Sequence, residues 1–230
     1  MSGDLIDTTE MYLRTLLELE EEGTPLMRAR IAERLGHSGP TVSQTVARME
    51  RDGLVSVHPD RHLELSPKGR ALATRVMRRH RLAERLLTDV IGLEWELVHE
   101  EACRWEHVIS TDVERRLVTI LNHPTESPYG NPIPALEELG VAPAPEGFLD
   151  GTEQLSLRLA DGAEHAVVIR RMSESIQSDP VLLRQMDDAG VRPGAPIRAA
   201  IVARELRLEG ASGECELPAH FADHVFITEA

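Results

Sequence analysis

Residues 28–65 read RARIAERLGHSGPTVSQTVARMERDGLVSVHPDRHLEL, and this stretch decides the fold of the N-terminal part. It opens with a short helical pattern that ends at Gly36, and a second helical pattern begins at Pro40, where Ser38 or Gly39 can cap it. Residues 54–57 and 62–65 then alternate between apolar and polar side chains around a turn, as paired strands do. Helix, turn, helix and two-stranded hairpin is the order of a winged helix-turn-helix, which predicts a DNA-binding domain.

The second helix of this unit is the one expected to enter the major groove. Its outward positions carry small hydroxyls near the N-terminus and longer polar side chains beyond, which suit phosphates and base edges. The alternative is a plain helical hairpin whose second helix faces water. The predicted DNA contacts are Arg28, Ser38, Pro40, Thr41, Ser43, Gln44, Arg48 and Arg51.

Charge is unevenly distributed along the 230 residues, whose formal net charge is −14. Residues 26–81 carry twelve Lys or Arg and five acids, a net charge of +7. The 25 residues before them have a net charge of −6, and the residues after them −15. A basic segment inside an acidic chain is the electrostatic footprint of a nucleic-acid binder. The alternative is a cationic face that pairs with the acidic remainder.

Composition excludes several classes of protein. Hydrophobic residues make up 41% and aromatic residues 3%, so a globular core must be mostly aliphatic. No apolar run approaches the ~18 residues of a membrane span, and Met1–Asp4 has no basic region typical of a secretory signal. Cys103 and Cys215 allow at most one disulfide. We therefore expect a cytoplasmic protein with no membrane partner.

Further elements are predicted on both sides of this unit. An amphipathic helix precedes it, three helices follow it, and six prolines between residues 124 and 145 indicate a linker around one short helical turn. Beyond Gly151 the alternation of short segments predicts a small β domain, expected to be a compact barrel. The predicted helices are Thr8–Glu22, Ser66–Ile91, Glu94–Ile109, Thr111–Leu121, Leu136–Leu139 and Val181–Ala189, and the predicted strands of the β domain are Gln154–Leu159, Ala166–Ile169, Ile197–Val202, Leu206–Leu208 and Val225–Ile227.

Potential metal ligands cluster on the helix predicted after residue 94. His99, Cys103, Glu106 and His107 lie within about 100° of one helical face. Imidazole, thiolate and carboxylate are the ligands that transition metals prefer. The stripe spans about 12 Å, too long for one ion, so Cys103, Glu106 and His107 form one group and His99 is left for a second.

The neighbouring helices offer partners for both groups. His80 and Glu84 are spaced i,i+4 on the preceding helix and complete a second site with His99. Met11 is the best soft candidate for a fourth ligand of the first group. The alternatives are ordinary core residues, or a hydrolase, because Cys103-x-x-Glu106-His107 imitates an inverted metalloprotease pattern. A catalytic zinc site needs an open position and a free carboxylate base, which this pattern does not provide.

These residues together resemble the iron-dependent regulator family. The likeness is close over about residues 4–140 and faint after residue 140. In that later part mainly the domain order and the motif Glu174-x-x-Gln177 match the family. The stretches that carry it are DTTEMYLRT (7–15), SGPTVSQTVARMERDGL (38–54), HRLAE (80–84), EACRWEH (101–107) and SPYGNPIP (127–134).

The resemblance implies two metal sites and a weaker anion site. Sulfur ligands point to the iron branch of the family, with Fe(II) at both sites and Co, Ni, Mn or Zn able to substitute in vitro. The implied primary site is Met11, Cys103, Glu106 and His107, the ancillary site is His80, Glu84, His99, Glu174 and Gln177, and the anion site is Arg81, Ser127 and Asn131.

The resemblance also implies a dimeric, Fe(II)-activated repressor of iron-homeostasis genes and no enzyme. Metal would tie the first helix to the Cys103 helix and so fix the DNA-reading heads, while residues 88–121 would form the dimer surface. A two-fold dimer implies a palindromic operator, with possibly two dimers on each. The implied domains are a winged helix-turn-helix (1–75), a helical dimerisation and metal-binding domain (76–140), a proline-rich linker (141–150) and an SH3-like β-barrel (151–230). A winged-helix regulator with a purely structural metal and a scaffold without DNA binding are the remaining alternatives.

Overall fold

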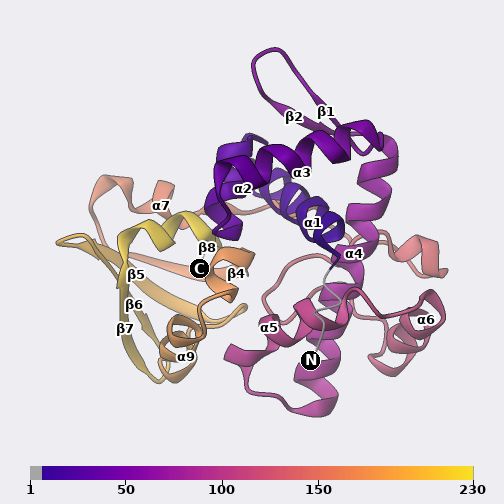
Figure 1. Cartoon of the computed structure of the whole chain (residues 1–230). Coiled ribbons are helices and arrows are strands. Elements are labelled where there is room, and N and C mark those ends of the chain that lie inside the picture. Colours follow the sequence, from indigo (N-terminus) through magenta and orange to yellow (C-terminus); the bar gives the residue numbers. More distant parts are fainter. Residues whose placement is uncertain (1–6, 230) are drawn as a thin grey trace, which may run out of the picture.

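The computed structural model describes residues 7–229, so the expectation about Met1–Asp4 lies outside the described range. The N-terminal part is helical and carries a small hairpin that projects from the body of the molecule (Figure 1). The order confirms the predicted winged helix-turn-helix. Its elements are α1 (Thr8–Glu21), α2 (Arg28–Leu35), α3 (Gly39–Arg51), β1 (Val55–Val57) and β2 (Leu63–Leu65).

Local capping chemistry explains these boundaries. The Ser38 side chain accepts a hydrogen bond from the backbone N–H of Thr41, and a proline occupies the first turn of α3. Ser66 caps the next helix in the same way, again followed by a proline. Gly69 allows the hairpin to pack closely on that helix, because a Cβ there would lie 1.9 Å from the carbonyl oxygen of Leu54.

Three helices follow the hairpin. Helix α4 (Pro67–Leu86) is long, and a π-helical turn, η1 (Leu87–Ile91), extends it as far as predicted. Helix α5 (Trp95–Trp105) ends four residues earlier than expected, so Glu106 and His107 lie just beyond its regular part. Helix α6 (Thr111–Ile120) completes this helical layer. No helix among residues 7–229 is long and apolar enough to cross a membrane.

The proline-rich segment packs against the C-terminal part. It contains the 3-10 turn η2 (Leu136–Leu139), and the backbone N–H of Met172 donates to the carbonyl of Tyr129. Gly130 has a φ of 80°, and a Cβ there would lie 2.0 Å from the carbonyl oxygen of Arg170. A glycine at this position therefore lets the segment lie directly on the following domain.

The C-terminal part is built on one antiparallel sheet of six strands, ordered β3-β8-β4-β5-β6-β7. No pairing joins β3 to β7 in the described chain, so the expected barrel is an open sheet. Its elements are β3 (Glu153–Gln154), α7 (Leu155–Arg158), η3 (Leu159–Asp161), β4 (His165–Met172), α8 (Glu174–Gln177), α9 (Pro180–Asp188), β5 (Pro196–Val202), β6 (Glu205–Gly210), β7 (Gly213–Pro218), η4 (Ala219–His224) and β8 (Val225–Glu229).

One expectation about this part is wrong, and one of its strands was not predicted. The predicted strand Gln154–Leu159 is mostly helical, because Leu155 and Leu159 are buried at i,i+4 spacing while Leu157 is exposed. The strand β7 was not predicted, since its sequence GECELP contains no β-branched residue.

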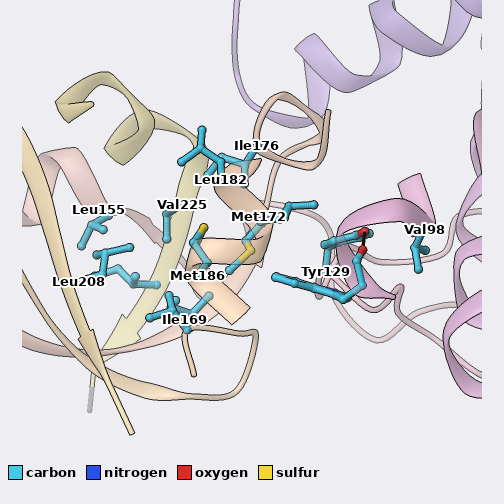
Figure 2. Close-up of a cluster of buried hydrophobic side chains, with 14 of the residues drawn as sticks. Val98, Tyr129, Leu155, Ile169, Met172, Ile176, Leu182, Met186, Leu208 and Val225 are labelled. Carbon is cyan, nitrogen blue, oxygen red and sulfur yellow. Dashed lines mark hydrogen bonds between the residues drawn. The ribbon is translucent and has the colours of Figure 1, made fainter. Parts of the chain in front are cut away.

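Two hydrophobic clusters fill the interior. One lies within the N-terminal unit. The other is continuous from α4 and α5 through the proline-rich segment into the C-terminal sheet. Figure 2 shows part of this cluster, with Tyr129 between Val98 on one side and Met172 on the other. The C-terminal part therefore shares its core with the helices.

Candidate metal centre and nucleic-acid surface

Helices α4 and α5 bring four of the predicted ligands together. His80 and Glu84 lie one turn apart on α4, and His99 and Cys103 lie one turn apart on α5. The His80 Nε2 is 2.8 Å from Glu84 Oε1 and 3.2 Å from His99 Nδ1. One ligand atom from each of His80, His99 and Cys103 lies within 4.8 Å of the other two. The i,i+4 spacings in the sequence thus meet across the interface of two packed helices.

Glu106 and His107 extend this cluster toward α1. Glu106 Oε2 lies 2.7 Å from His80 Nδ1, and its Oε1 lies 3.4 Å from His107 Nε2. His107 Nδ1 donates to Glu10 Oε2 at 2.7 Å, so Nε2, which faces Glu106, is the ring nitrogen that would bind a metal once it is deprotonated. This is how metal-binding histidines are commonly held, with the second ring nitrogen on a carboxylate. Met11 packs, partly buried, against the N-terminal core, so Glu10 makes the polar contact of α1 with His107.

The C-terminal part contributes two further predicted ligands from α8. Gln177 Oε1 lies 3.1 Å from His99 Nδ1. Glu174 instead accepts from Arg81 at 2.9 Å, while its Oε2 is buried without a hydrogen-bond partner among residues 7–229. His80 contacts Glu84 and His99 of one predicted site and Glu106 of the other. The ligands of the two predicted sites therefore form one continuous polar cluster.

Arg14 is the main residue of the cluster that the sequence did not suggest. Its Nη1 lies 2.9 Å from His80 Nδ1, 3.1 Å from Glu106 Oε2 and 3.4 Å from Cys103 Sγ. Its spacing of three residues from Met11, on the same helical face, was the signal available.

Burial and charge shift the pKa values of the cluster in opposite directions. Burial alone raises the pKa of the Cys103 thiol, but Arg14 and His99 outweigh burial and hold that pKa well below its usual value. Burial lowers the pKa of His99, yet the Cys103 thiolate and Glu84 raise it to about 9. Burial raises the pKa of Glu84, but His80 and His99 lower it to about 2. The cluster is therefore a set of buried ion pairs.

The donor set fits a first-row divalent transition metal. Two imidazoles on facing helices, a thiol with a low pKa and several carboxylates suit such ions, whereas calcium and magnesium require oxygen ligands throughout. The buried, unpartnered oxygen of Glu174 is a further acceptor next to this set.

The residues of the predicted anion site have other partners in the structure. The Arg81 guanidinium donates to Glu21, Glu174 and the carbonyl of Pro132. Asn131 Nδ2 donates to the carbonyl of Met172, and the Ser127 hydroxyl accepts from the N–H of Tyr129. An anion beside these residues stays a prediction.

The predicted DNA-contacting face of α3 is open. Thr41, Ser43, Gln44, Arg48 and Arg51 are exposed, while Val42, Val46 and Met49 are buried on the opposite face. Arg28 is half-buried, and Ser38 and Thr41 share a hydrogen bond of 2.8 Å at the helix start. A hollow of about 270 Å³ lies between α3 and the start of α1, lined by Thr8, Gln44, Thr45, Arg48 and Arg51.

Some basic residues of this unit pair with α1 and others do not. Arg34, Arg70 and Arg81 form ion pairs with Glu18, Glu20 and Glu21 of α1. Arg48 and Arg51 form no ion pair within the described chain. The acids of α1 therefore neutralise Arg34, Arg70 and Arg81. The exposed face of α3 keeps the positive charges of Arg48 and Arg51.

Family models match most of the N-terminal and central parts. Residues 4–63 match the N-terminal DNA-binding domain of iron-dependent repressors, and residues 66–135 match their metal-binding and dimerisation domain. The iron-dependent repressor IdeR of Mycobacterium tuberculosis is 64% identical over 195 residues, covering 85% of this chain and 84% of that protein. The diphtheria toxin repressor of Corynebacterium diphtheriae is 57% identical over 194 residues, covering 84% of each.

Solved structures agree with these matches. A manganese-dependent transcriptional repressor in complex with manganese has a TM-score of 0.77 at 26% identity, covering 97% of this chain and 100% of that one. The IdeR of T. acidophilum has a TM-score of 0.72 at 25% identity, covering 97% and 98%. The resemblance found in the sequence is thereby confirmed, and the chain belongs to the iron-dependent repressor family.

Proposed function

We propose that the chain is an Fe(II)-activated, dimeric transcriptional repressor that binds palindromic operators of iron-homeostasis genes in the cytoplasm. One observation carries the proposal. The buried ligand cluster joins α1, on which the DNA-reading unit is built, to α4, α5 and α8. A cation bound there acts on all four elements at once, and therefore on the position of α3.

We assign the ligands as the sequence predicts. The bound ion supplies positive charge and directional bonds to nitrogen, sulfur and oxygen atoms. Glu10 orients the ring of His107. The primary site comprises Met11, Cys103, Glu106 and His107, and the ancillary site His80, Glu84, His99, Glu174 and Gln177.

Exposed apolar side chains support a dimer through residues 88–121. Val90, Ile91, Val108, Val113 and Ile120 are 46–62% exposed, and all lie on η1, on α6 or near the end of α5. Several large exposed apolar side chains within one stretch of helices support an interface there. A two-fold dimer presents two α3 helices to two half-sites of a palindrome, and we propose that one or two dimers occupy each operator.

We also retain the predicted domain boundaries. The winged helix-turn-helix ends near residue 75, the dimerisation and metal-binding domain near 140, and the linker near 150. The hydrolase alternative is wrong, because the family is one of repressors.

Anaerobic selection from a pool of genomic DNA fragments tests the proposal, with Fe(II) in one arm and chelator in the other. We expect enrichment of a palindrome in the Fe(II) arm alone. Equal enrichment in both arms would make the metal structural, and no enrichment in either would contradict the DNA-binding assignment. Arg48→Gln is the matched negative control, because it removes an exposed charge of α3 without touching the metal cluster.

A further inference from the structure

The guanidinium of Arg14 lies at the point where the ligands of both predicted metal sites converge. Its Nη1 lies within 3.4 Å of a ring nitrogen of His80, a carboxylate oxygen of Glu106 and the sulfur of Cys103. His80 belongs to the ancillary set, and Cys103 and Glu106 belong to the primary set. A single cationic nitrogen thus contacts a nitrogen, an oxygen and a sulfur atom of three proposed metal ligands.

Arg14 is deeply buried, and its charge is balanced by these same donors. Its side chain is 9% exposed, that of Glu106 1% and that of His80 0%. A buried guanidinium is tolerated only when paired, and here the partners are Glu106, Glu18 and the thiolate of Cys103. Conversely, Glu106, Glu18 and Cys103 would each lose one cationic partner in the metal-free protein if Arg14 were absent.

A metal ion and the guanidinium compete for the same carboxylate and sulfur atoms. A ligand oxygen or sulfur binds a metal at about 2.0–2.3 Å, closer than a guanidinium nitrogen approaches it. The Nη1 cannot keep its contacts with Glu106 and Cys103 while a divalent cation bonds those atoms, because both groups are positive. Binding of metal therefore requires the guanidinium to leave the cluster.

Arg14 has a second attachment that it can keep after leaving. Its Nε lies 3.2 Å from Glu18 Oε1, one turn further along α1, and Glu18 is not one of the proposed ligands. We propose that Arg14 is an internal substitute cation, which occupies the ligand cluster without metal, withdraws to Glu18 when metal binds, and so sets the metal concentration needed for activation. The inference rests on the proposed function, since it assumes that these ligands bind metal.

The test uses Co(II) with the full-length protein, because thiolate-to-cobalt absorption reports ligation by Cys103. Affinity is measured by competition with a chelator for the wild type, Arg14→Gln and Arg14→Lys. We expect Arg14→Gln to bind Co(II) at least about tenfold more tightly, with Arg14→Lys between it and the wild type. Arg78→Gln is the matched control, since Arg78 is equally buried but pairs with Glu114 outside the cluster, and its affinity should match the wild type.

Thermal unfolding is the second readout. Without metal, Arg14→Gln should unfold at a lower temperature, because buried Glu18 and Glu106 each lose an ion pair, and Co(II) should raise its midpoint more than that of the wild type. If Arg14→Gln does not fold without metal, the inference requires Co(II) to restore folding below the concentration that saturates the wild type, and absence of rescue would overturn it.

The outcomes separate this inference from the proposed function. Unchanged or weaker Co(II) affinity in Arg14→Gln, with a normal thiolate absorption band in the wild type, would overturn the role of Arg14 alone. Absence of the band and of Co(II) binding in the wild type would overturn the metal centre itself.

Discussion

Two buried regions hold the C-terminal domain against α4 and α5, one apolar and one charged. The apolar region is the cluster of Figure 2, in which Tyr129 packs beside Met172 and donates to the carbonyl of Trp95. The charged region consists of the contacts from α8 to His99 and Arg81. Apolar packing is insensitive to protons and cations, whereas each group of the charged region can exchange its partner. The apolar region therefore holds the C-terminal domain in place, whereas the contacts of the charged region change with pH and with bound cations.

The largest effect should come from breaking the apolar region. Tyr129→Ala removes a fully buried ring and its hydrogen bond, so we expect the free energy of unfolding to fall by about 3–5 kcal/mol. Urea titration measures this change. Tyr129→Phe is the control and should cost about 1 kcal/mol, because only the hydrogen bond is lost. A loss in Tyr129→Ala no greater than in Tyr129→Phe would contradict a shared core.

Cys103→Ala should abolish Fe(II)-activated DNA binding, with operator affinity at saturating Fe(II) reduced at least about a hundredfold. The sulfur is a proposed ligand of the primary site, and no neighbouring thiol replaces it within the described chain. Gel-shift titration under anaerobic conditions measures the effect. Cys215→Ala is the matched control, because Cys215 lies in β7, remote from the ligands, and should bind DNA as the wild type does.

Metal affinity should rise with pH. The pKa of His99 is raised to about 9, so its imidazole is protonated at pH 7 and must release that proton before a metal can bind. Each released proton strengthens apparent binding about tenfold per pH unit until the pH reaches the pKa. Co(II) competition titrations at pH 7, 8 and 9 measure the slope. A flat profile would show that His99 is neutral in the metal-free protein.

The smallest effect is expected at the ancillary site. His80→Ala should weaken Fe(II)-activated DNA binding about tenfold without abolishing it, because the primary ligands stay in place. The same gel-shift series measures it beside Cys103→Ala. Equal losses in the two variants would contradict the division into primary and ancillary sites.

Local signals account for most of what the sequence predicted. Serine caps followed by prolines place the starts of α3 and α4, and i,i+4 spacing places His80 with Glu84. Such signals act within one helix, so sequence reasoning reaches them.

The parts that were missed depend on contacts between distant segments. An arginine on an amphipathic helix normally faces water, so its spacing from Met11 alone was too weak a signal to predict that Arg14 is buried against α5. Gln177 came from the family resemblance alone, since its partner His99 is 78 residues away in the sequence. The open sheet was missed because strand alternation does not determine whether the first and last strands pair.

The open sheet has one further consequence, for self-association. Strand β7 pairs only with β6 among the described residues, so its outer backbone groups form an edge to which a strand of another molecule could add. Glu214 and Glu216 are exposed on this strand, and Pro218 at its end cannot donate a ladder hydrogen bond. Like charges would face each other if two such edges met. The strand thus disfavours edge-to-edge association into fibres. The proposed dimer uses the surface of residues 88–121 instead.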